Sequence, residues 1–189
     1  KESGVTVLFF GEGATEEGVF HEALNFAKLR KLPVLFVCEN NLYSVYSPMS
    51  VRQPAGRGVT DLANGHGLPV FSGDGNDIAE VTTLTKQALA CLSEGPALME
   101  FSTYRWFEHC GPFYDNHIGY RSEEEFLRWK ERCPLVRWEH VLTQQGLLTP
   151  ERLLALHDEI DTEIAAAMAY AKSSPFPNPD TLCQEVYAS

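Results

Sequence analysis

The hydrophobic positions in the first part of the chain alternate between a strand pattern and a helix pattern. Residues 5–10, VTVLFF, form a β-branched, apolar and aromatic run that ends at a glycine. Such a run predicts a parallel strand that is buried on both faces. Thr15 is then the expected cap of a helix, because the apolar residues beyond it have the spacing of one helical face. These residues are Val19, Phe20, Ala23, Leu24 and Ala27.

A second apolar run, PVLFVC at residues 33–38, predicts the neighbouring strand. Strand, helix and strand in this order predict a right-handed crossover between two parallel strands. Two more strands are expected at residues 68–71 and 96–104, and two more helices are expected to begin at Asp77 and Ser122. Asp and Ser favour these positions because their side chains accept hydrogen bonds from the first N–H groups of a helix.

The chain beyond residue 134 has a helical pattern. One helix is expected to end before Gly146, and Thr149 is expected to begin a long helix that runs to about Lys172. The proline-rich segment at residues 173–180, SSPFPNPD, cannot continue a helix and is expected to be extended.

The alternation of strands and helices predicts an α/β protein, a three-layer sandwich with a mainly parallel sheet followed by a C-terminal helical region. We expect residues 1–133 to form the α/β domain and residues 134–189 to pack on the same domain as helices and a tail. Residues 48–69 and 105–121 are expected to be long loops. The strand at residues 5–10 has the pattern of a central strand, and its position almost at the first residue suggests that part of the domain precedes this sequence.

Composition and charge narrow the classes of function. The chain has 189 residues, of which 44% are hydrophobic, so it can bury a core. Its net charge of −11 opposes binding to nucleic acid or to an anionic membrane surface. It contains no apolar run near the roughly 20 residues that span a bilayer and no signal-peptide pattern, so a cytoplasmic location is predicted. The five cysteines contain no C-x-x-C pair, which argues against a disulfide framework or a zinc knuckle.

The glycine turn GEGATEEG, residues 11–18, follows the first expected strand. It is not a dinucleotide fingerprint, because Glu16 stands where the third glycine would be, and it lacks the Gly-Lys-Ser/Thr ending of a P-loop. Glycines let the backbone approach a ligand, and the N–H groups of the next helix can bind a phosphate. Glu12 would repel a bare phosphate. A divalent cation between them removes this conflict, because Mg²⁺ and Ca²⁺ prefer carboxylate and phosphate oxygens.

A second group of polar residues follows the neighbouring expected strand, in the sequence CENNLY. Asn40, Asn41 and Tyr43 should therefore emerge at the same edge of the sheet as Glu12, the edge where open α/β sheets bind ligands. Amide and backbone carbonyl oxygens complete a magnesium shell without adding charge. Each turn is common by itself, but their combination at the ends of consecutive strands predicts a metal and diphosphate site.

The stretch GEGATEEGVFHEALNFAKLRKLPVLFVCENNLYS, residues 11–44, resembles the thiamine diphosphate motif, which opens with Gly-Asp-Gly and closes with Asn-Asn. More narrowly, it resembles the alpha subunit of the decarboxylating component of 2-oxo acid dehydrogenases, the pyruvate, branched-chain and acetoin group. The resemblance continues through SGDGNDIAEVTTLTKQAL and GPALMEFSTYR into the C-terminal helices. It implies the thiamine diphosphate-binding fold, with the N-terminal part of the family's subunit absent from this sequence.

The resemblance also implies a role for individual residues. Magnesium would be bound by the side chains of Glu12, which replaces the aspartate of the motif, and Asn41, together with the main-chain oxygen of Tyr43. The diphosphate would be contacted by Gly11, Gly13, Ala14 and Arg105.

His109 matches a loop histidine that handles protons near the thiazolium of the cofactor. Cys110 stands where several relatives carry a regulated serine, so kinase control at that position is not implied. His109 and Cys110 are adjacent and would point in different directions, so they do not form a nucleophilic Cys-His pair. Together with His117 they could ligate zinc, although their spacing matches no common zinc site.

Two hypotheses of different classes follow. The first is an enzyme subunit that uses thiamine diphosphate and magnesium to decarboxylate a 2-oxo acid, or to cleave an acyloin such as acetoin, and passes the fragment to an acceptor. In the two-chain enzymes the glutamate that activates the cofactor comes from the beta subunit, which is the implied partner. Self-association is also expected, through the strand at residues 5–10 and the aromatic loop at residues 106–120. The alternative is a non-catalytic interaction module that retains the fold.

Overall fold

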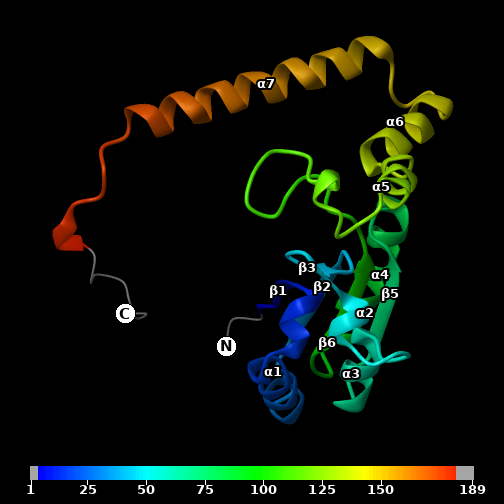
Figure 1. Cartoon of the computed structure of the whole chain (residues 1–189). Helices are drawn as coiled ribbons and strands as arrows, with labels where there is room; N and C mark the ends of the chain where they lie inside the picture. Colours follow the sequence, from blue (N-terminus) through cyan, green and yellow to red (C-terminus); the bar gives the residue numbers. More distant parts are fainter. Residues whose placement is uncertain (1–3, 182–189) are drawn as a thin grey trace. The chain divides into compact units, whose positions relative to one another are not determined.

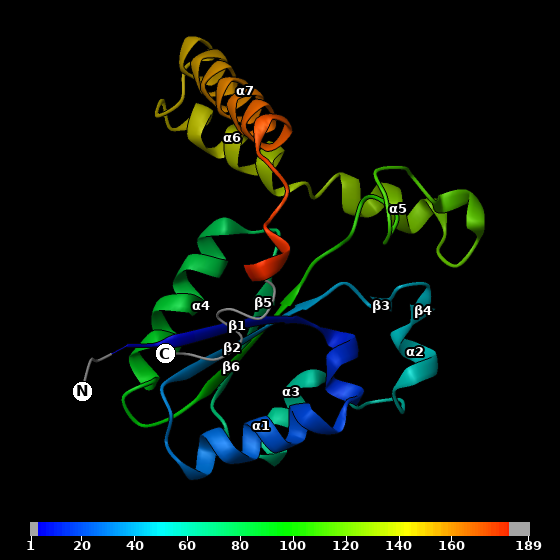
Figure 2. The same cartoon turned by 90° about the vertical axis from the view of Figure 1, so that its left-hand side faces the viewer.

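The computed structural model describes residues 4–181 and divides the chain into two compact units, residues 1–138 and residues 139–189. The first unit contains a four-stranded, entirely parallel sheet with the strand order β1-β2-β6-β5 (Figures 1 and 2). Its strands are β1 (Thr6–Gly11), β2 (Val34–Asn40), β5 (Val70–Asp74) and β6 (Ala97–Ser102). The four expected strands are thus present, and the predicted α/β class with a parallel sheet is confirmed.

Helices cover both faces of this sheet, as Figure 2 shows. On one face α1 (Gly18–Leu29) and α3 (Val59–Gly65) bury side chains such as Leu24 and Ala63 against Phe36 and Leu98 of the sheet. On the other face α4 (Ile78–Cys91) packs with Ala88 against the opposite side chains of β2 and β6. Side chains on successive strand residues point to opposite faces, so β2 and β6 contribute to both cores.

Strand β1 lies at the edge of the sheet and is not buried on both faces as its sequence predicts. Its only neighbour among the described strands is β2, and the side chains of Val7, Leu8 and Phe9 are 46%, 45% and 66% exposed. An open groove of about 350 Å³ lies between β1, the adjoining strands and α4, and it is lined by Phe9, Val37 and other apolar residues. The apolar run indicated a strand, but burial of that strand requires neighbours that residues 4–181 do not supply.

Of the residues predicted to cap helices in the first unit, Asp77 and Ser122 do so and Thr15 does not. Asp77 accepts hydrogen bonds from Ala79 N and Glu80 N at the start of α4, and Ser122 caps α5 (Glu123–Lys130) in the same way. Both predictions are confirmed. Thr15 is not a cap, because residues Glu12–Glu16 form a 3₁₀ turn, η1, before α1 begins. Its hydroxyl instead donates to the carbonyl oxygen of Glu12 at 2.7 Å and closes this turn.

The segment at residues 48–69 is not the long loop that its glycine and proline content predicts. It contains α2 (Met49–Arg52) and α3, and α2 follows a small hairpin formed by β3 (Tyr43–Ser44) and β4 (Ser47–Pro48). The aromatic segment after β6 is mostly irregular and includes one 3₁₀ turn, η2 (Asn116–Ile118).

The second unit begins within α6 (Pro134–Gln144) and contains α7 (Pro150–Ser173) and a 3₁₀ turn, η3 (Pro179–Thr181). Thr149 caps α7 by accepting a hydrogen bond from Arg152 N. Gly146 has a φ of 69°, which glycine adopts without strain, and it ends the preceding helix as predicted. Within residues 4–181, no helix has the length and apolarity needed to cross a bilayer. The expected boundary between residues 133 and 134, and the packing of the C-terminal region on the first domain, stay predictions.

Two leucines of α1, one buried and one exposed, provide a matched test of the core. Leu24 is fully buried and Leu29 is 74% exposed. We expect Leu24→Ala to lower the free energy of unfolding by about 2–5 kcal/mol, because it removes buried methyl groups and leaves a cavity. Leu29→Ala should change it by less than about 0.5 kcal/mol. Urea unfolding followed by circular dichroism measures both, and equal effects of the two changes would contradict the burial described for α1.

Candidate functional site

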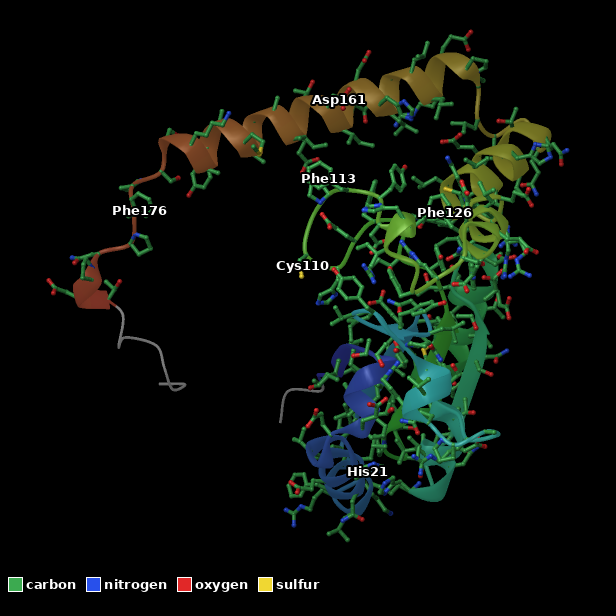
Figure 3. All side chains as sticks on the ribbon, in the orientation of Figure 1. His21, Cys110, Phe113, Phe126, Asp161 and Phe176 are labelled. Atoms are coloured by element: carbon green, nitrogen blue, oxygen red, sulfur yellow. The ribbon has the colours of Figure 1, made fainter. Side chains whose placement is uncertain are left out.

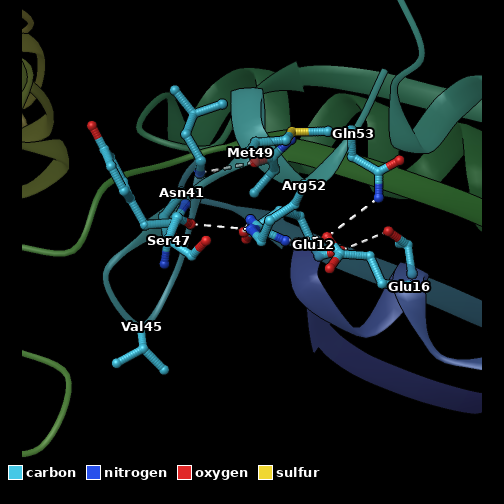
Figure 4. Close-up of polar contacts among 12 residues, drawn as sticks. Glu12, Glu16, Asn41, Val45, Ser47, Met49, Arg52 and Gln53 are labelled. Carbon is cyan, nitrogen blue, oxygen red and sulfur yellow. Dashed lines mark hydrogen bonds and ion pairs between the residues drawn. The ribbon is translucent and has the colours of Figure 1, made fainter. Parts of the chain in front are cut away.

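Glu12 is a buried carboxylate at the carboxyl end of β1. It opens the turn η1, and only 2% of the residue is exposed. Gly11 of β1 pairs with Glu39 of β2, so Glu12 and Asn41 follow the ends of two adjacent parallel strands. Figure 4 shows both residues at this edge. The parallel pairing therefore brings two of the predicted site residues to one edge of the sheet, although they are far apart in the sequence.

The glycine turn is packed against the hairpin β3–β4 at Gly13. A Cβ at position 13 would lie 2.8 Å from Ser44 Oγ and 3.6 Å from Arg52 Nη1, so a larger residue does not fit without movement. A Cβ at Gly11 would meet no described atom within 4 Å. Packing thus explains Gly13, and Gly11 leaves open space beside the backbone where a ligand could approach.

Arg52 of α2 is the direct partner of Glu12. Its Nη2 lies 2.5 Å from Glu12 Oε1, its Nη1 pairs with Glu16, and its Nε donates to Ser47 O at 3.1 Å (Figure 4). The side chain of Arg52 is 10% exposed. A buried carboxylate requires a counter-charge, and here the guanidinium provides it.

The two asparagines after β2 have different environments. Asn40 is 7% exposed, donates through Nδ2 to Glu100 Oε1 at 2.7 Å and accepts from Leu42 N through Oδ1 at 2.9 Å. It is therefore held in the body of the domain. Asn41 is less buried, and its Oδ1 accepts one hydrogen bond, from Tyr43 N at 2.9 Å. Each carbonyl oxygen has two acceptor positions, so Asn41 can accept a further contact.

Tyr43 connects the hairpin to α5. Its hydroxyl lies 2.9 Å and 3.0 Å from the two carboxylate oxygens of Glu125. Burial, followed by this hydrogen bond and the charge of Glu125, raises the pKa of Tyr43. The hydroxyl is therefore a donor at neutral pH and holds the backbone of Tyr43, whose carbonyl is the predicted ligand, in a defined position.

The pKa of the Cys38 thiol is affected by acidic residues near this edge of the sheet. Burial, followed by the charges of Glu100, Glu12 and Glu39, raises the pKa of this thiol. Cys38 is fully buried in β2 and is not a candidate nucleophile.

The loop after β6 is organised by a buried ion pair. Arg121 and Asp115 are both almost fully buried, and Arg121 Nη2 lies 2.6 Å from Asp115 Oδ1. Tyr120 donates its hydroxyl proton to the other carboxylate oxygen at 2.8 Å. Burial by itself would raise the pKa of Asp115, but the hydrogen bonds from Tyr120 and Arg121 and the charge of Arg121 outweigh it, so this pKa lies below its usual value.

Arg105 joins this loop to the hairpin at the sheet edge. Its guanidinium donates to Phe107 O at 2.8 Å, to Val45 O at 2.8 Å and to the hydroxyl of Tyr120 at 3.2 Å. Val45 lies between β3 and β4, two residues after Tyr43. Arg105 therefore lies beside the hairpin that carries the predicted metal ligands.

His109 and Cys110 are exposed residues of the same loop, and Figure 3 shows Cys110 at its periphery. Among residues 4–181, neither side chain has a hydrogen-bond or ionic partner. The structure thus does not join His109 to Glu12, Asn41 or Arg105 by a direct contact. The role of His109 in proton transfer stays a prediction.

The donor set at the sheet edge fits a magnesium ion in its chemistry. It offers a carboxylate, an amide oxygen and a main-chain oxygen, all hard ligands of the kind Mg²⁺ prefers. In the part of the chain described, no group of three or more His, Cys, Asp or Glu residues could hold a metal. Glu12 is thus the one acidic ligand of the predicted set, and oxygens of a phosphate or of water would complete the shell. His109, Cys110 and His117 do not form such a group within the described residues.

Sequence reasoning missed Arg52, Ser44 and the Asp115–Arg121 pair. Arg52 lies in a segment that carries no motif, and Ser44 is the last residue of the motif stretch; their contacts with Glu12 and Gly13 depend on tertiary folding. The burial of Glu12 is one signal that could have found Arg52, since a buried acid implies a basic partner. Asp115 and Arg121 lie in a loop whose sequence is typical of a surface segment. The local sequence therefore does not distinguish this buried pair from exposed charged residues.

Comparison with known proteins gives concordant matches. A family model described as Dehydrogenase E1 component matches residues 1–180. The chain is 38% identical over 190 residues to the 2-oxoisovalerate dehydrogenase subunit alpha of Bacillus subtilis (strain 168), covering 100% of this chain and 57% of that protein. It is 35% identical over 186 residues to the mitochondrial 2-oxoisovalerate dehydrogenase subunit alpha of Homo sapiens, covering 97% and 41%.

A relative with a different name is similar to nearly the same degree. The chain is 32% identical over 187 residues to the pyruvate dehydrogenase E1 component subunit alpha of Rickettsia typhi (strain ATCC VR-144 / Wilmington), covering 98% of this chain and 56% of that protein. The chain therefore spans about half the length of the curated relatives it matches.

The Asp115–Arg121 pair generates a pH-dependent prediction. Because the pKa of Asp115 is lowered by folding, its ionised form stabilises the folded state above the usual carboxyl pKa of 3.8, and this contribution is lost as the pH falls below that value. We expect Asp115→Asn to lower the free energy of unfolding by about 2–4 kcal/mol at pH 7, because it removes one partner of a buried pair. The difference from the unmodified chain should shrink below about pH 4.

The control is Asp161→Asn, since Asp161 is an exposed residue of α7 without a described partner (Figure 3). It should leave the unfolding midpoint unchanged at both pH values. Denaturant titrations at pH 7 and pH 3.5 measure the differences. An effect of Asp115→Asn that is as large at pH 3.5 as at pH 7 would contradict the lowered pKa.

Proposed function

The chain belongs to the dehydrogenase E1 component family, and on this premise we propose that it is part of the alpha-type subunit of a thiamine diphosphate- and magnesium-dependent 2-oxo acid dehydrogenase. Thiamine diphosphate is the cofactor of the family. The proposed reaction is decarboxylation of a 2-oxo acid, or cleavage of an acyloin such as acetoin, with transfer of the fragment to an acceptor. The cofactor would supply the electron sink for cleavage of the bond to carbon.

The observation that carries this proposal is the position of Glu12. A carboxylate with 2% exposure stands at the end of β1, next to the end of β2, where Asn41 and Tyr43 follow. Burial of a carboxylate is costly, and Arg52 compensates for the charge of Glu12 in the structure described. A metal-ligand role explains why this position carries an acid.

The proposed division of roles is the one that the family resemblance implies. Glu12, Asn41 and the main-chain oxygen of Tyr43 would hold magnesium, and the open space beside Gly11 would admit the diphosphate together with Gly13 and Ala14. Arg105 would bring positive charge to the diphosphate from the hairpin side. His109 is exposed, so it would be free to exchange protons with the cofactor or the substrate.

We propose a 2-oxo acid as the class of substrate, without naming an individual compound. The relatives above carry the names 2-oxoisovalerate dehydrogenase and pyruvate dehydrogenase at 38% and 32% identity, which supports neither substrate over the other. The predicted cytoplasmic location also stays a prediction, since the relative from Homo sapiens is mitochondrial.

The cofactor proposal is tested by calorimetric titration with thiamine diphosphate in the presence of Mg²⁺. We expect saturable binding that disappears when Mg²⁺ is omitted, because the ion would join Glu12 to the diphosphate. Glu12→Gln should weaken this binding by about 10–100-fold, since the amide keeps the size but loses the charge of the ligand.

Glu22→Gln is the matched control, because Glu22 is an exposed residue of the adjacent helix α1 without a described partner. It should bind the cofactor like the unmodified chain. A chain that is folded by circular dichroism yet binds no thiamine diphosphate with Mg²⁺ would favour the alternative, a non-catalytic module that retains the fold.

We further propose two kinds of partner, a beta subunit and a second copy of this chain. The relatives are named as alpha subunits, which supports a complementary subunit. The open edge of β1, with its unpaired backbone groups and exposed Val7, Leu8 and Phe9, supports self-association. Closed dimers are the commonest form that such surfaces take.

Light scattering of the purified chain is expected to give the mass of a dimer, and the chain alone should not decarboxylate 2-oxo acids. Phe9→Asp should shift the mass toward that of a monomer, because it places a charge on the exposed edge. Addition of a beta subunit should be required for turnover, measured as release of carbon dioxide.

Leu29→Asp serves as the control, since Leu29 is as exposed as Phe9 but lies on α1. It should leave the dimer intact. A monodisperse monomer would contradict self-association, and cofactor-dependent turnover by the chain alone would contradict the need for a beta subunit.

A further inference from the structure

The guanidinium of Arg52 occupies the part of the site where a cation bound to Glu12 would lie. Its Nη2 is 2.5 Å from Glu12 Oε1, and its Nη1 is 3.6 Å from the position that a Cβ of residue 13 would take. It thus lies against both the predicted metal ligand and the glycine turn that is predicted to contact the diphosphate. Figure 4 shows this arrangement, with Asn41 on the other side of Arg52.

A divalent cation and Arg52 cannot both use this oxygen of Glu12 in the arrangement described. Mg²⁺ binds oxygen at about 2.1 Å and requires near-octahedral geometry, so it needs an unobstructed approach to the carboxylate. The donor Nη2 lies at a direct hydrogen-bonding distance from that oxygen. Binding of a metal through Oε1 of Glu12 therefore requires the guanidinium to move, and an ion bound through the other carboxylate oxygen would lie close to the like charge of Arg52.

A second acidic residue, Glu16, can retain the guanidinium after it leaves Glu12. Glu16 pairs with Nη1 and also accepts from Gln53 Nε2 at 3.3 Å, and its side chain is 33% exposed. Glu16 lies at the end of η1, one turn from Glu12. Arg52 can give up Glu12 and remain bonded to Glu16, beside the glycine turn.

We propose that Arg52 is a built-in counter-cation of Glu12 that competes with the divalent ion and, once displaced, remains on Glu16 to attract the diphosphate. The inference rests on the proposed function, because it concerns the same site. It has a specific consequence. The ion alone must displace Arg52 from Oε1 or bind beside its like charge. When a diphosphate is also present, its negative charge attracts the guanidinium and offsets this cost. Metal and diphosphate should therefore bind cooperatively, and Arg52 should be the origin of part of that cooperativity.

The test measures binding of Mn²⁺, as a spectroscopic substitute for Mg²⁺, by electron paramagnetic resonance of the free ion. Titrations are made on the full chain, with and without inorganic diphosphate. Arg52→Gln should tighten binding of Mn²⁺ alone by about tenfold, the scale of one hydrogen bond to a charged group. It should also reduce the factor by which diphosphate enhances Mn²⁺ binding.

The matched control is Arg57→Gln, because Arg57 belongs to the same segment but is exposed, and its guanidinium bonds only Gln53 among the residues that the structure describes. It should leave both Mn²⁺ affinities unchanged. Arg52→Lys retains a positive charge and loses the two-pronged geometry, so it should tighten Mn²⁺ binding by less than Arg52→Gln does. This variant keeps the test valid if Arg52→Gln does not fold.

The outcomes separate this inference from the proposed function. Unchanged or weaker Mn²⁺ binding by the folded Arg52 variants, with binding by the unmodified chain intact, would overturn the competition and leave the proposed function standing. Absence of Mn²⁺ binding to every variant, with diphosphate present, would overturn both. Thermal unfolding gives an independent readout: Mn²⁺ should raise the melting temperature of Arg52→Gln more than that of the unmodified chain, because the ion then replaces the missing counter-charge of Glu12.

Discussion

The parallel pairing of β1 with β2 is the constraint on which the candidate site depends. Its register places Gly11 opposite Glu39, so the glycine turn and the Asn40–Tyr43 segment leave the sheet side by side. The turn η1 then directs Glu12 inward, and the bond from Thr15 to the carbonyl of Glu12 fixes it. A shift of one residue in this pairing would turn every β1 side chain to the opposite face and separate Glu12 from Asn41.

Charged side chains make most of the other contacts described at that edge of the sheet. Glu12, Glu39 and Glu100 all act on the buried thiol of Cys38, so three acids lie within electrostatic range of one point in β2. Arg52 neutralises Glu12, and Asn40 donates to Glu100. The second charged centre, Asp115 with Arg121, holds the loop that carries Arg105 and His109. The site therefore combines a rigid acidic edge with a loop that is anchored at its base.

The sequence predicts the parts of this structure that local chemistry determines. The four strands follow from apolar runs, and Asp77, Ser122 and Thr149 cap helices because their side chains reach the first free N–H groups. Glu12 and Asn41 could be placed at one edge from topology alone. Thr15 fails as a cap because the backbone forms a 3₁₀ turn first. The exposure of β1, the helices at residues 49–65 and the Arg52–Glu12 pair depend on tertiary neighbours, which no local pattern contains.

The contact between the glycine turn and the hairpin links two positions that are far apart in the sequence. A Cβ on residue 13 would lie 2.8 Å from the hydroxyl oxygen of Ser44. The space is sufficient for glycine with serine but not for two larger side chains. In related sequences, residues 13 and 44 should therefore vary as a pair, with an increase in size at one position accompanied by a decrease at the other. The hairpin thus restricts the evolution of the turn, even where the turn has no ligand to bind.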